Sequence, residues 1–198
     1  MKKQLVGFTI CLVIGVGLGT IAKYLDTFTG YDGNWLMNIP SYLGDLFTRL
    51  GIWVLIATLI AAYSRTQISA ALNTLLFFIG MLISYYLYSA YLFGVFSTSD
   101  IIYWSGLALV SPFLAVIIWH ARNHTRLAWT LPALPIAFML TLSLGLGFFY
   151  IVLNHIEELI MSVILCLTFY QSRKQLVVIM FISFVLSFVI KQISPFHF

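Results

Sequence analysis

Seven apolar segments follow one another along the chain, separated by short polar gaps, and each is close to the length of a membrane-spanning helix. They cover residues 5–22, 42–63, 68–90, 101–121, 127–150, 153–170 and 176–190. A helix needs ~20 apolar residues to cross the hydrocarbon layer, so the pattern predicts an all-α bundle of seven transmembrane helices. The segment at 153–170 is the weakest, and a six-helix bundle is the alternative. No linker-like stretch interrupts the pattern, so we expect a single transmembrane helical domain over residues 1–198.

Two neighbouring segments carry features that interrupt a regular helix. Pro132 and Pro135 lie in the first third of 127–150, where each removes a backbone amide donor and crowds the preceding turn. In a membrane such breaks persist only where protein or water pairs the freed carbonyls. If the next helix begins only at Ile156, its length to Tyr170 is ~22 Å, which is short for a span.

The composition is that of an integral membrane protein. Hydrophobic residues make up 62% of the chain, charged residues 8%, and the mean hydropathy is +1.03. This excludes a soluble domain, because no core of this size absorbs so much apolar side chain. The net charge of +4 indicates no nucleic-acid binding, since the basic residues stand singly or in pairs at segment ends. Cys11 and Cys166 lie in apolar runs without partners for a disulfide or a metal, so we expect free thiols.

The charged residues are segregated by sign between alternate gaps. Acidic residues occupy one set of gaps, and they are Asp26, Asp32, Asp45, Asp100, Glu157 and Glu158. Seven of the ten Lys and Arg residues fall in the other gaps or at the N-terminus. Because basic residues favour the cytoplasmic side, this predicts a cytoplasmic N-terminus and, with seven helices, a C-terminus outside. We expect a multi-pass protein of the cell membrane, in a bacterial inner membrane, with the first apolar run retained.

A stripe of small residues follows one face of the first predicted helix. Cys11, Gly15 and Gly19 are spaced four residues apart, and such spacing lets two helix backbones approach closely in lipid. The stripe predicts a tight helix contact. The contact is either internal to the bundle, which we favour, or made with a partner membrane protein.

The sharpest polar cluster consists of Asn154, His155, Glu157 and Glu158. One interpretation is a solvated outer loop in which the glutamates cap a helix N-terminus and interact with its dipole. The other is that the helix starts earlier and carries the carboxylates below the membrane surface, where charged groups normally face a cavity or a partner.

Further polar residues are candidates for the same outer cavity. Asp45 and Arg49 form an acid-first i, i+4 pair, so they either neutralise each other or leave Arg49 to meet Glu157 or Glu158. Asn73 is expected to make an interhelical hydrogen bond or to line the cavity. His120 and His124 lack a carboxylate on their side of the membrane, so we predict no metal site there. No Ser-His-Asp order, phosphate loop, nucleotide motif or HExxH appears, and we expect neither an enzyme nor a cofactor.

The small-residue stripe and the loop at 23–40 resemble the substrate-binding components of energy-coupling-factor vitamin transporters. The resemblance implies that Cys11, Gly15 and Gly19 dock to a partner and that Tyr31 and Trp35 form a lid over an outward cavity. That family differs in having six helices and both termini inside. Much of the chain also resembles small bacterial multi-pass membrane proteins, a likeness that implies no mechanism.

Two functions follow as hypotheses. The first is binding or transport of a small molecule or ion through an outward-facing cavity, because transporters place their sites at interrupted helices. The alternative is a non-catalytic membrane subunit for immunity, assembly or complex stabilisation. The expected partners are the lipid bilayer, a small ligand and a membrane protein bound through the first helix, with no nucleic acid.

Overall fold

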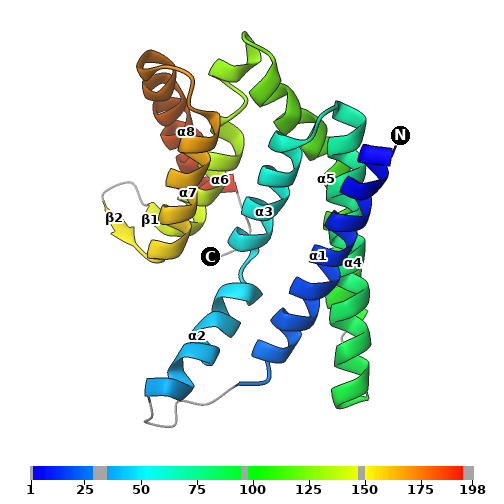
Figure 1. Ribbon diagram of the computed structural model, residues 1–198. Coiled ribbons are helices and arrows are strands. Elements are labelled where there is room, and N and C mark those ends of the chain that lie inside the picture. Colours follow the sequence, from blue (N-terminus) through cyan, green and yellow to red (C-terminus); the bar gives the residue numbers. More distant parts are fainter. Residues whose placement is uncertain (1, 29–34, 95–97, 147–149, 194–198) are drawn as a thin grey trace.

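The computed structural model describes residues 2–28, 35–94, 98–146 and 150–193 (Figure 1). In chain order the elements are α1 (Lys2–Leu25), α2 (Trp35–Thr48), α3 (Leu50–Tyr63), α4 (Gln67–Phe93), α5 (Thr98–Asn123), the 3₁₀ turn η1 (Leu127–Trp129), α6 (Ala133–Ser143), β1 (Leu144–Leu146), β2 (Ile151–Leu153), α7 (Ile156–Phe169) and α8 (Arg173–Ile193). The predicted helical class is confirmed, and the β1–β2 hairpin is the one departure from it among the described residues.

The helices form two groups with α3 between them (Figure 1). In one group α1 packs along α4 and α4 packs on α5, while in the other α6 packs against α7 and α8. Helix α3 contacts α4 and α5 on one side and α6 and α7 on the other. It contributes Trp53 to a core that contains Phe77, and Ala61 to a second core that contains Met139 and Leu165. The position of α3 therefore determines how the two groups meet.

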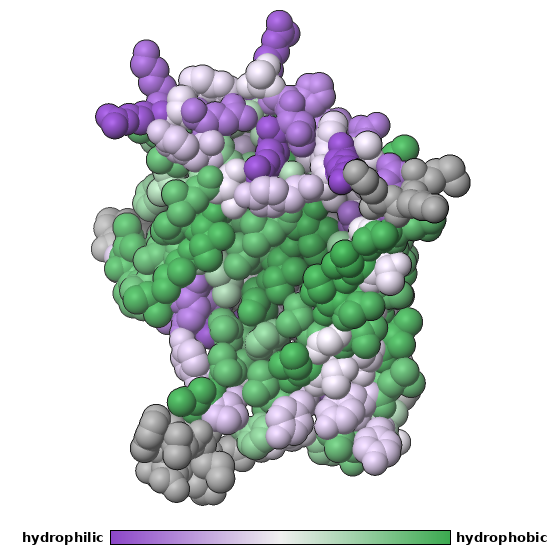
Figure 2. Space-filling view, viewed as in Figure 1, coloured by the Kyte–Doolittle hydropathy of each residue, from purple (hydrophilic) through white to green (hydrophobic). Residues whose placement is uncertain are grey.

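Within the described part of the chain, four helices are long and apolar enough to cross a membrane, over Gln4–Leu25, Gln67–Phe93, Asp100–Asn123 and Arg173–Ile193. The bent pair α2–α3 makes a fifth candidate if its two parts count as one span. Figure 2 shows hydrophobic surface over the middle of the molecule and hydrophilic residues gathered at one end. This length and composition are those of a membrane protein.

Three turns meet at the hydrophilic end. Trp119 Nε1 donates a hydrogen bond to the Ser64 carbonyl at 3.0 Å, which joins the end of α5 to the turn after α3. Gln171 Nε2 donates to the Arg122 carbonyl at 3.5 Å, which joins the turn after α7 to the same region. These turns and the helix ends beside them carry Arg65, Arg122, Arg126, Arg173 and Lys174. Five of the basic residues that the sequence assigns to one side thus lie at one end.

Two predicted helices differ from those observed. The segment at 42–63 belongs to two helices, α2 and α3, bent by 66° about Arg49. The prediction of one helix over 127–150 is wrong, because α6 starts only after Pro132 and stops at Ser143. Pro132 cannot continue the preceding turn, so α6 starts after it. Glycine at position 145 disfavours helix, and the chain there forms a hairpin with Leu144 opposite Leu153.

Candidate functional site

The break between α2 and α3 is a structured feature with paired carbonyls. Arg49 has extended backbone there, with φ −77° and ψ 145°. Trp53 Nε1 donates to the Phe47 carbonyl at 2.8 Å. The Asp45 carbonyl accepts from Thr48 Oγ1 at 2.8 Å and from Arg49 Nε at 3.4 Å. Side chains next to the break therefore pair carbonyls at the end of α2 that lack a helical partner.

Arg49 faces two carboxylates on α7. Its Nη1 lies 3.1 Å from Glu158 Oε2 and 3.5 Å from Glu157 Oε2. The Glu158 side chain is 1% exposed, whereas those of Glu157 and Arg49 are 17% and 22% exposed. Both glutamates lie in the first turn of α7, where the helix dipole favours negative charge. With all three groups ionised the cluster carries one excess negative charge.

Because α6 stops at Ser143, the start of α7 lies beside Arg49. The Ser143 carbonyl at the end of α6 accepts from the backbone amides of Asn154 at 2.9 Å and His155 at 3.2 Å. His155 then caps α7 in an extended conformation. The hairpin thus reverses the chain within two short strands, and α7 starts beside the break in α2–α3. A full helix over 127–150 would have placed the glutamates elsewhere.

Gly51 gives Glu158 the space that it occupies. A Cβ at position 51 would lie 2.9 Å from Glu158 Cγ and 3.3 Å from its Oε1. Oε1 is itself buried and has no hydrogen-bond partner among the described residues. A buried carboxylate oxygen left unpaired is unfavourable, so this glutamate is held by Arg49 on one side only.

A cavity of about 320 Å³ lies next to this ion pair. Its lining residues come from the break, from α5 and from the region around α6 and α7, and they are Thr48, Arg49, Leu50, Tyr103, Trp104, Leu142, His155 and Glu158. In Figure 2 a hydrophilic patch appears within the hydrophobic surface at the height of the α2–α3 junction. The volume is at the lower end of the range for small-molecule sites, and its mixed lining is typical of them.

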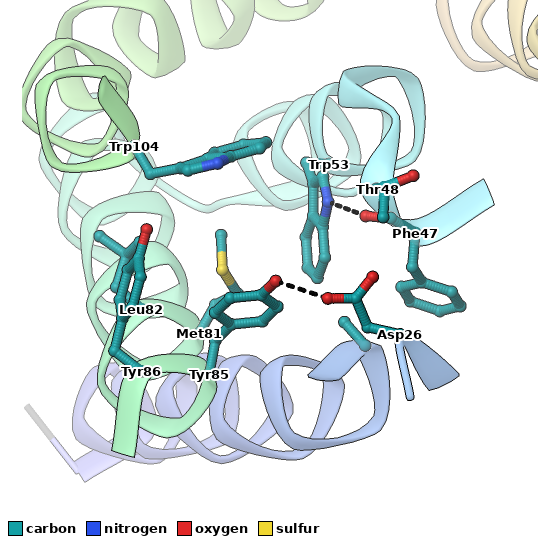
Figure 3. Close-up of a pocket in the computed structure, with 10 residues that line it drawn as sticks. Asp26, Phe47, Thr48, Trp53, Met81, Leu82, Tyr85, Tyr86 and Trp104 are labelled. Carbon is teal, nitrogen blue, oxygen red and sulfur yellow. Dashed lines mark hydrogen bonds between the residues drawn. The ribbon is translucent and has the colours of Figure 1, made fainter. Parts of the chain in front are cut away.

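A second, smaller cavity of about 130 Å³ adjoins the first, and Thr48 and Trp104 line both. Figure 3 shows this cavity among aromatic side chains and the Asp26 carboxylate. Tyr85 donates a hydrogen bond to Asp26 Oδ2 at 3.0 Å, and Lys23 Nζ contacts the same oxygen at 2.9 Å.

The acidic start of α7 also has the composition of a metal-binding group. His155, Glu157 and Glu158 each offer a ligand atom, and these atoms lie within 4.8 Å of one another. One imidazole and two carboxylates are a ligand set that Zn²⁺ accepts. Arg49 already contacts both carboxylates, so a metal ion on this set would have to displace its guanidinium.

The structure brings together four of the residues singled out from the sequence: Arg49, His155, Glu157 and Glu158. Asp45 and Asn73 do not line the larger cavity. Asp45 is exposed, and only its backbone carbonyl takes part in the break. Asn73 donates to Ser64 Oγ at 3.1 Å in the turn between α3 and α4, next to the basic end.

Of the two remaining candidates, Asn154 and Trp35, the structure describes the side chain of Asn154 only. Asn154 is exposed, and its backbone amide, bonded to Ser143, carries its structural role. The side chain of Trp35 lies outside the described residues, as does Tyr31, so the predicted lid stays a prediction.

Sequence reasoning missed the apolar and hydroxyl-bearing walls of the cavity. Thr48, Tyr103, Trp104 and Leu142 carry no signal that separates them from interfacial aromatic or lipid-facing residues. The sequence indicates a role for Gly51 only weakly: this glycine stands two residues after the charged Arg49, inside an apolar run.

The small-residue stripe of α1 lies against α4. A Cβ on Gly15 would collide with the backbone carbonyl of Phe77, and one on Gly19 with the Met81 carbonyl and Ser84 Oγ. From the other side, a Cβ on Gly80 would lie 2.6 Å from the Leu12 carbonyl. These glycines therefore mediate a contact within the chain, and a partner at α1 would have to use other residues.

Comparison with protein-family models, with curated proteins and with solved structures finds no match to this chain. What the fold and the site define is a helical protein with membrane-spanning composition and a charged cluster at a broken helix. Its function has to be inferred from the chemistry of that cluster.

Proposed function

We propose that this protein binds a small polar solute in the cavity beside Arg49 and Glu158, and that binding is a step of transport across a membrane. One observation carries the proposal. Glu158 is almost fully buried and lines a cavity; one of its oxygens is bound to Arg49, and the other has no partner among the residues that the structure describes. Ionisable groups within membrane-spanning regions are unfavourable and characteristically mark substrate or ion pathways.

The charge of the cluster indicates what the solute carries. Arg49 meets two carboxylates, so the site has an excess of hydrogen-bond acceptors and of negative charge. A ligand with a donor group, such as an ammonium or a hydroxyl, complements it. The apolar part of such a ligand would lie against Leu50, Leu142 and the ring of Trp104. A purely anionic solute is disfavoured by the two glutamates.

The proposed membrane arrangement has seven helices, with α2–α3 as one broken span and with α6 and α7 as short helices joined by the hairpin. The N-terminus is cytoplasmic, the C-terminus is outside, and the membrane is a bacterial inner membrane. The gathering of basic residues at one end supports this orientation. In it the cavity opens toward the outside, and the break in α2–α3 and the reversal after α6 both lie next to the site, as in transporters with interrupted helices.

The alternative function, a non-catalytic membrane subunit, is weakened by one contact. Its predicted docking surface on α1 is the stripe of Gly15 and Gly19, and both glycines contact α4 within the chain. Such a subunit would need another surface.

Native mass spectrometry of the protein, extracted with its surrounding lipid into polymer nanodiscs, tests the proposal. We expect a small-molecule adduct that is lost in Glu158→Gln and in Arg49→Ala. Asp45→Asn is the matched control, because it makes a carboxylate-to-amide change on an exposed side chain that lines neither cavity.

Two results contradict the proposal: an adduct retained equally in all variants, or a wild-type protein that carries no adduct and also shows no uptake of metabolites into proteoliposomes. A stoichiometric protein partner in place of the adduct supports the alternative function.

A further inference from the structure

Half of the side chains that line the smaller cavity are aromatic. They are Phe47, Trp53, Tyr85, Tyr86 and Trp104. In Figure 3, Trp104, Trp53 and Tyr85 stand around the cavity, and the Asp26 carboxylate lies at its edge. The rings come from α2, α3, α4 and α5, so only the tertiary structure assembles them.

Bonds and ring contacts fix the rings that form the wall. The Trp53 indole donates to the Phe47 carbonyl at 2.8 Å and meets the Phe47 ring edge-on at 5.8 Å between centroids. The Tyr85 hydroxyl donates to Asp26, and its ring meets that of Tyr86 edge-on at 5.3 Å. A cavity whose walls are fixed in this way is organised before a ligand enters.

The wall of this cavity already holds a cation on its outer side. Lys23 Nζ lies 5.0 Å from the centroid of the Tyr85 ring and 2.9 Å from Asp26 Oδ2. Lys23 does not line the cavity. Aromatic faces carry negative electrostatic potential and attract cations within about 6 Å of their centroids. Trp53 and Trp104 also line the cavity, so a second cation inside it would contact their rings.

The class of that cation follows from what the lining lacks. A divalent metal ion needs several oxygen ligands, and a primary ammonium needs acceptors for three N–H groups. Among the described residues the lining offers one carboxylate, already paired with Lys23, and a few hydroxyls such as that of Thr48. A methylated ammonium has no N–H group to satisfy, and its charge is attracted by ring faces.

The size agrees with this class. The cavity measures about 130 Å³. An apolar cavity of about 150 Å³ accommodates benzene, and a tetramethylammonium group is slightly bulkier than that ring. The smaller cavity is partly open, so such a group can enter it while the rest of a solute stays outside. We propose that this aromatic cavity is a binding site for a quaternary ammonium group, either on a free solute or on a lipid headgroup. The site uses none of Arg49, Glu157 and Glu158, although it shares Thr48 and Trp104 with the larger cavity.

Saturation-transfer NMR on the methyl signal of tetramethylammonium, at constant ionic strength, tests the site in the full-length protein. We expect saturable binding, weakened about tenfold in Trp104→Leu and less in Trp104→Phe, which keeps an aromatic face. Trp104 is only half-buried, so both variants can be checked for folding by their thermal midpoints. Asp26→Asn should also weaken binding, whereas Asp45→Asn and Glu158→Gln should leave it within twofold.

The inference is overturned if tetramethylammonium shows no saturable binding, if uncharged tert-butanol binds equally well, or if folded Trp104→Leu binds like wild type. Lipid nanodiscs then separate the two sources of the ligand. Competition by phosphatidylcholine but not by phosphatidylglycerol assigns the site to a lipid headgroup. Undiminished tetramethylammonium binding in phosphatidylcholine nanodiscs assigns it to a free solute.

Discussion

Arg49 Nη1 lies 3.1 Å from Glu158 Oε2, although the two residues are 109 positions apart in the chain. The contact joins the break in α2–α3 to the first turn of α7, and so connects the start of α3 to the group formed by α6, α7 and α8. Glu158 is far more buried than Arg49, with 1% against 22% of the side chain exposed. The buried Glu158 carboxylate therefore needs the opposite charge of its partner more than the partly exposed Arg49 guanidinium does.

Arg49→Met should destabilise the protein, because it leaves Glu158 charged, buried and without its partner. We expect a loss of about 3 kcal/mol, the lower end of the range for breaking a buried pair. The double variant Arg49→Met/Glu158→Gln should recover part of that loss. Chemical unfolding in detergent micelles measures the coupling, with Arg65→Met in an exposed turn as control. Additive effects of the two substitutions would show that the pair is not coupled.

Gly51→Ala should disturb the site without changing any charge. The added methyl would lie 2.9 Å from Glu158 Cγ, so the glutamate has to move away from Arg49. We expect a loss of about 1–3 kcal/mol, as for other overpacked positions. Gly17→Ala is the control, because a Cβ there meets nothing within 4 Å, and alanine should be neutral or slightly stabilising at that helical position. Equal unfolding midpoints for the two variants would contradict the close approach at Gly51.

Gly15→Ala and Gly80→Ala should each force α1 and α4 apart. The atoms that a new methyl would meet are backbone carbonyls, those of Phe77 and Leu12, which cannot rotate away. Each variant should lower the thermal midpoint at least as much as Gly51→Ala does, whereas Gly17→Ala should not. If Gly15→Ala instead leaves stability unchanged and dissociates a co-purified protein, the stripe serves a partner.

Trp53→Phe should loosen the break in α2–α3. The substitution keeps an aromatic ring but removes the donor that pairs the Phe47 carbonyl. An unsatisfied buried acceptor costs about 1–3 kcal/mol. Trp129→Phe is the matched control, because Trp129 is 40% exposed. Hydrogen exchange over 42–56 should rise in the first variant only; unchanged exchange there would mean that the bend does not depend on this bond.

Cysteine labelling tests the membrane arrangement. Arg65 and Tyr91 lie close to opposite ends of α4, whose 27 residues span ~40 Å, more than a ~30 Å hydrocarbon layer. In a background with Cys11 and Cys166 replaced by serine, an impermeant maleimide added to intact cells should label Tyr91→Cys. It should label Arg65→Cys only after the cells are opened. The reverse result would invert the proposed orientation, and labelling of both from outside would exclude a span between them.

Local pattern was sufficient for four of the eight described α-helices. The runs that became α1, α4, α5 and α8 are long and uninterrupted, and length with hydropathy predicts such helices because their backbone bonds are all made within the segment. The gathering of five basic residues at one end also agrees with the charge pattern, because alternate turns of consecutive antiparallel helices meet at one end. The stripe at Gly15 and Gly19 predicted a close helix contact but not that α4 makes it.

Tertiary structure decided the site. The run at 42–63 reads as one helix, since nothing local to Arg49 requires a break, and the break is stabilised by the Trp53 indole and by the carboxylates of α7. Likewise, whether Glu158 is an exposed cap or a buried charge depends on where α6 ends, 15 residues earlier in the chain. The sequence determined which groups were available and that five of the basic residues share one end of the molecule. Only packing determined which of them meet, because burial, cavities and ion pairs between distant segments are properties of the assembled helices.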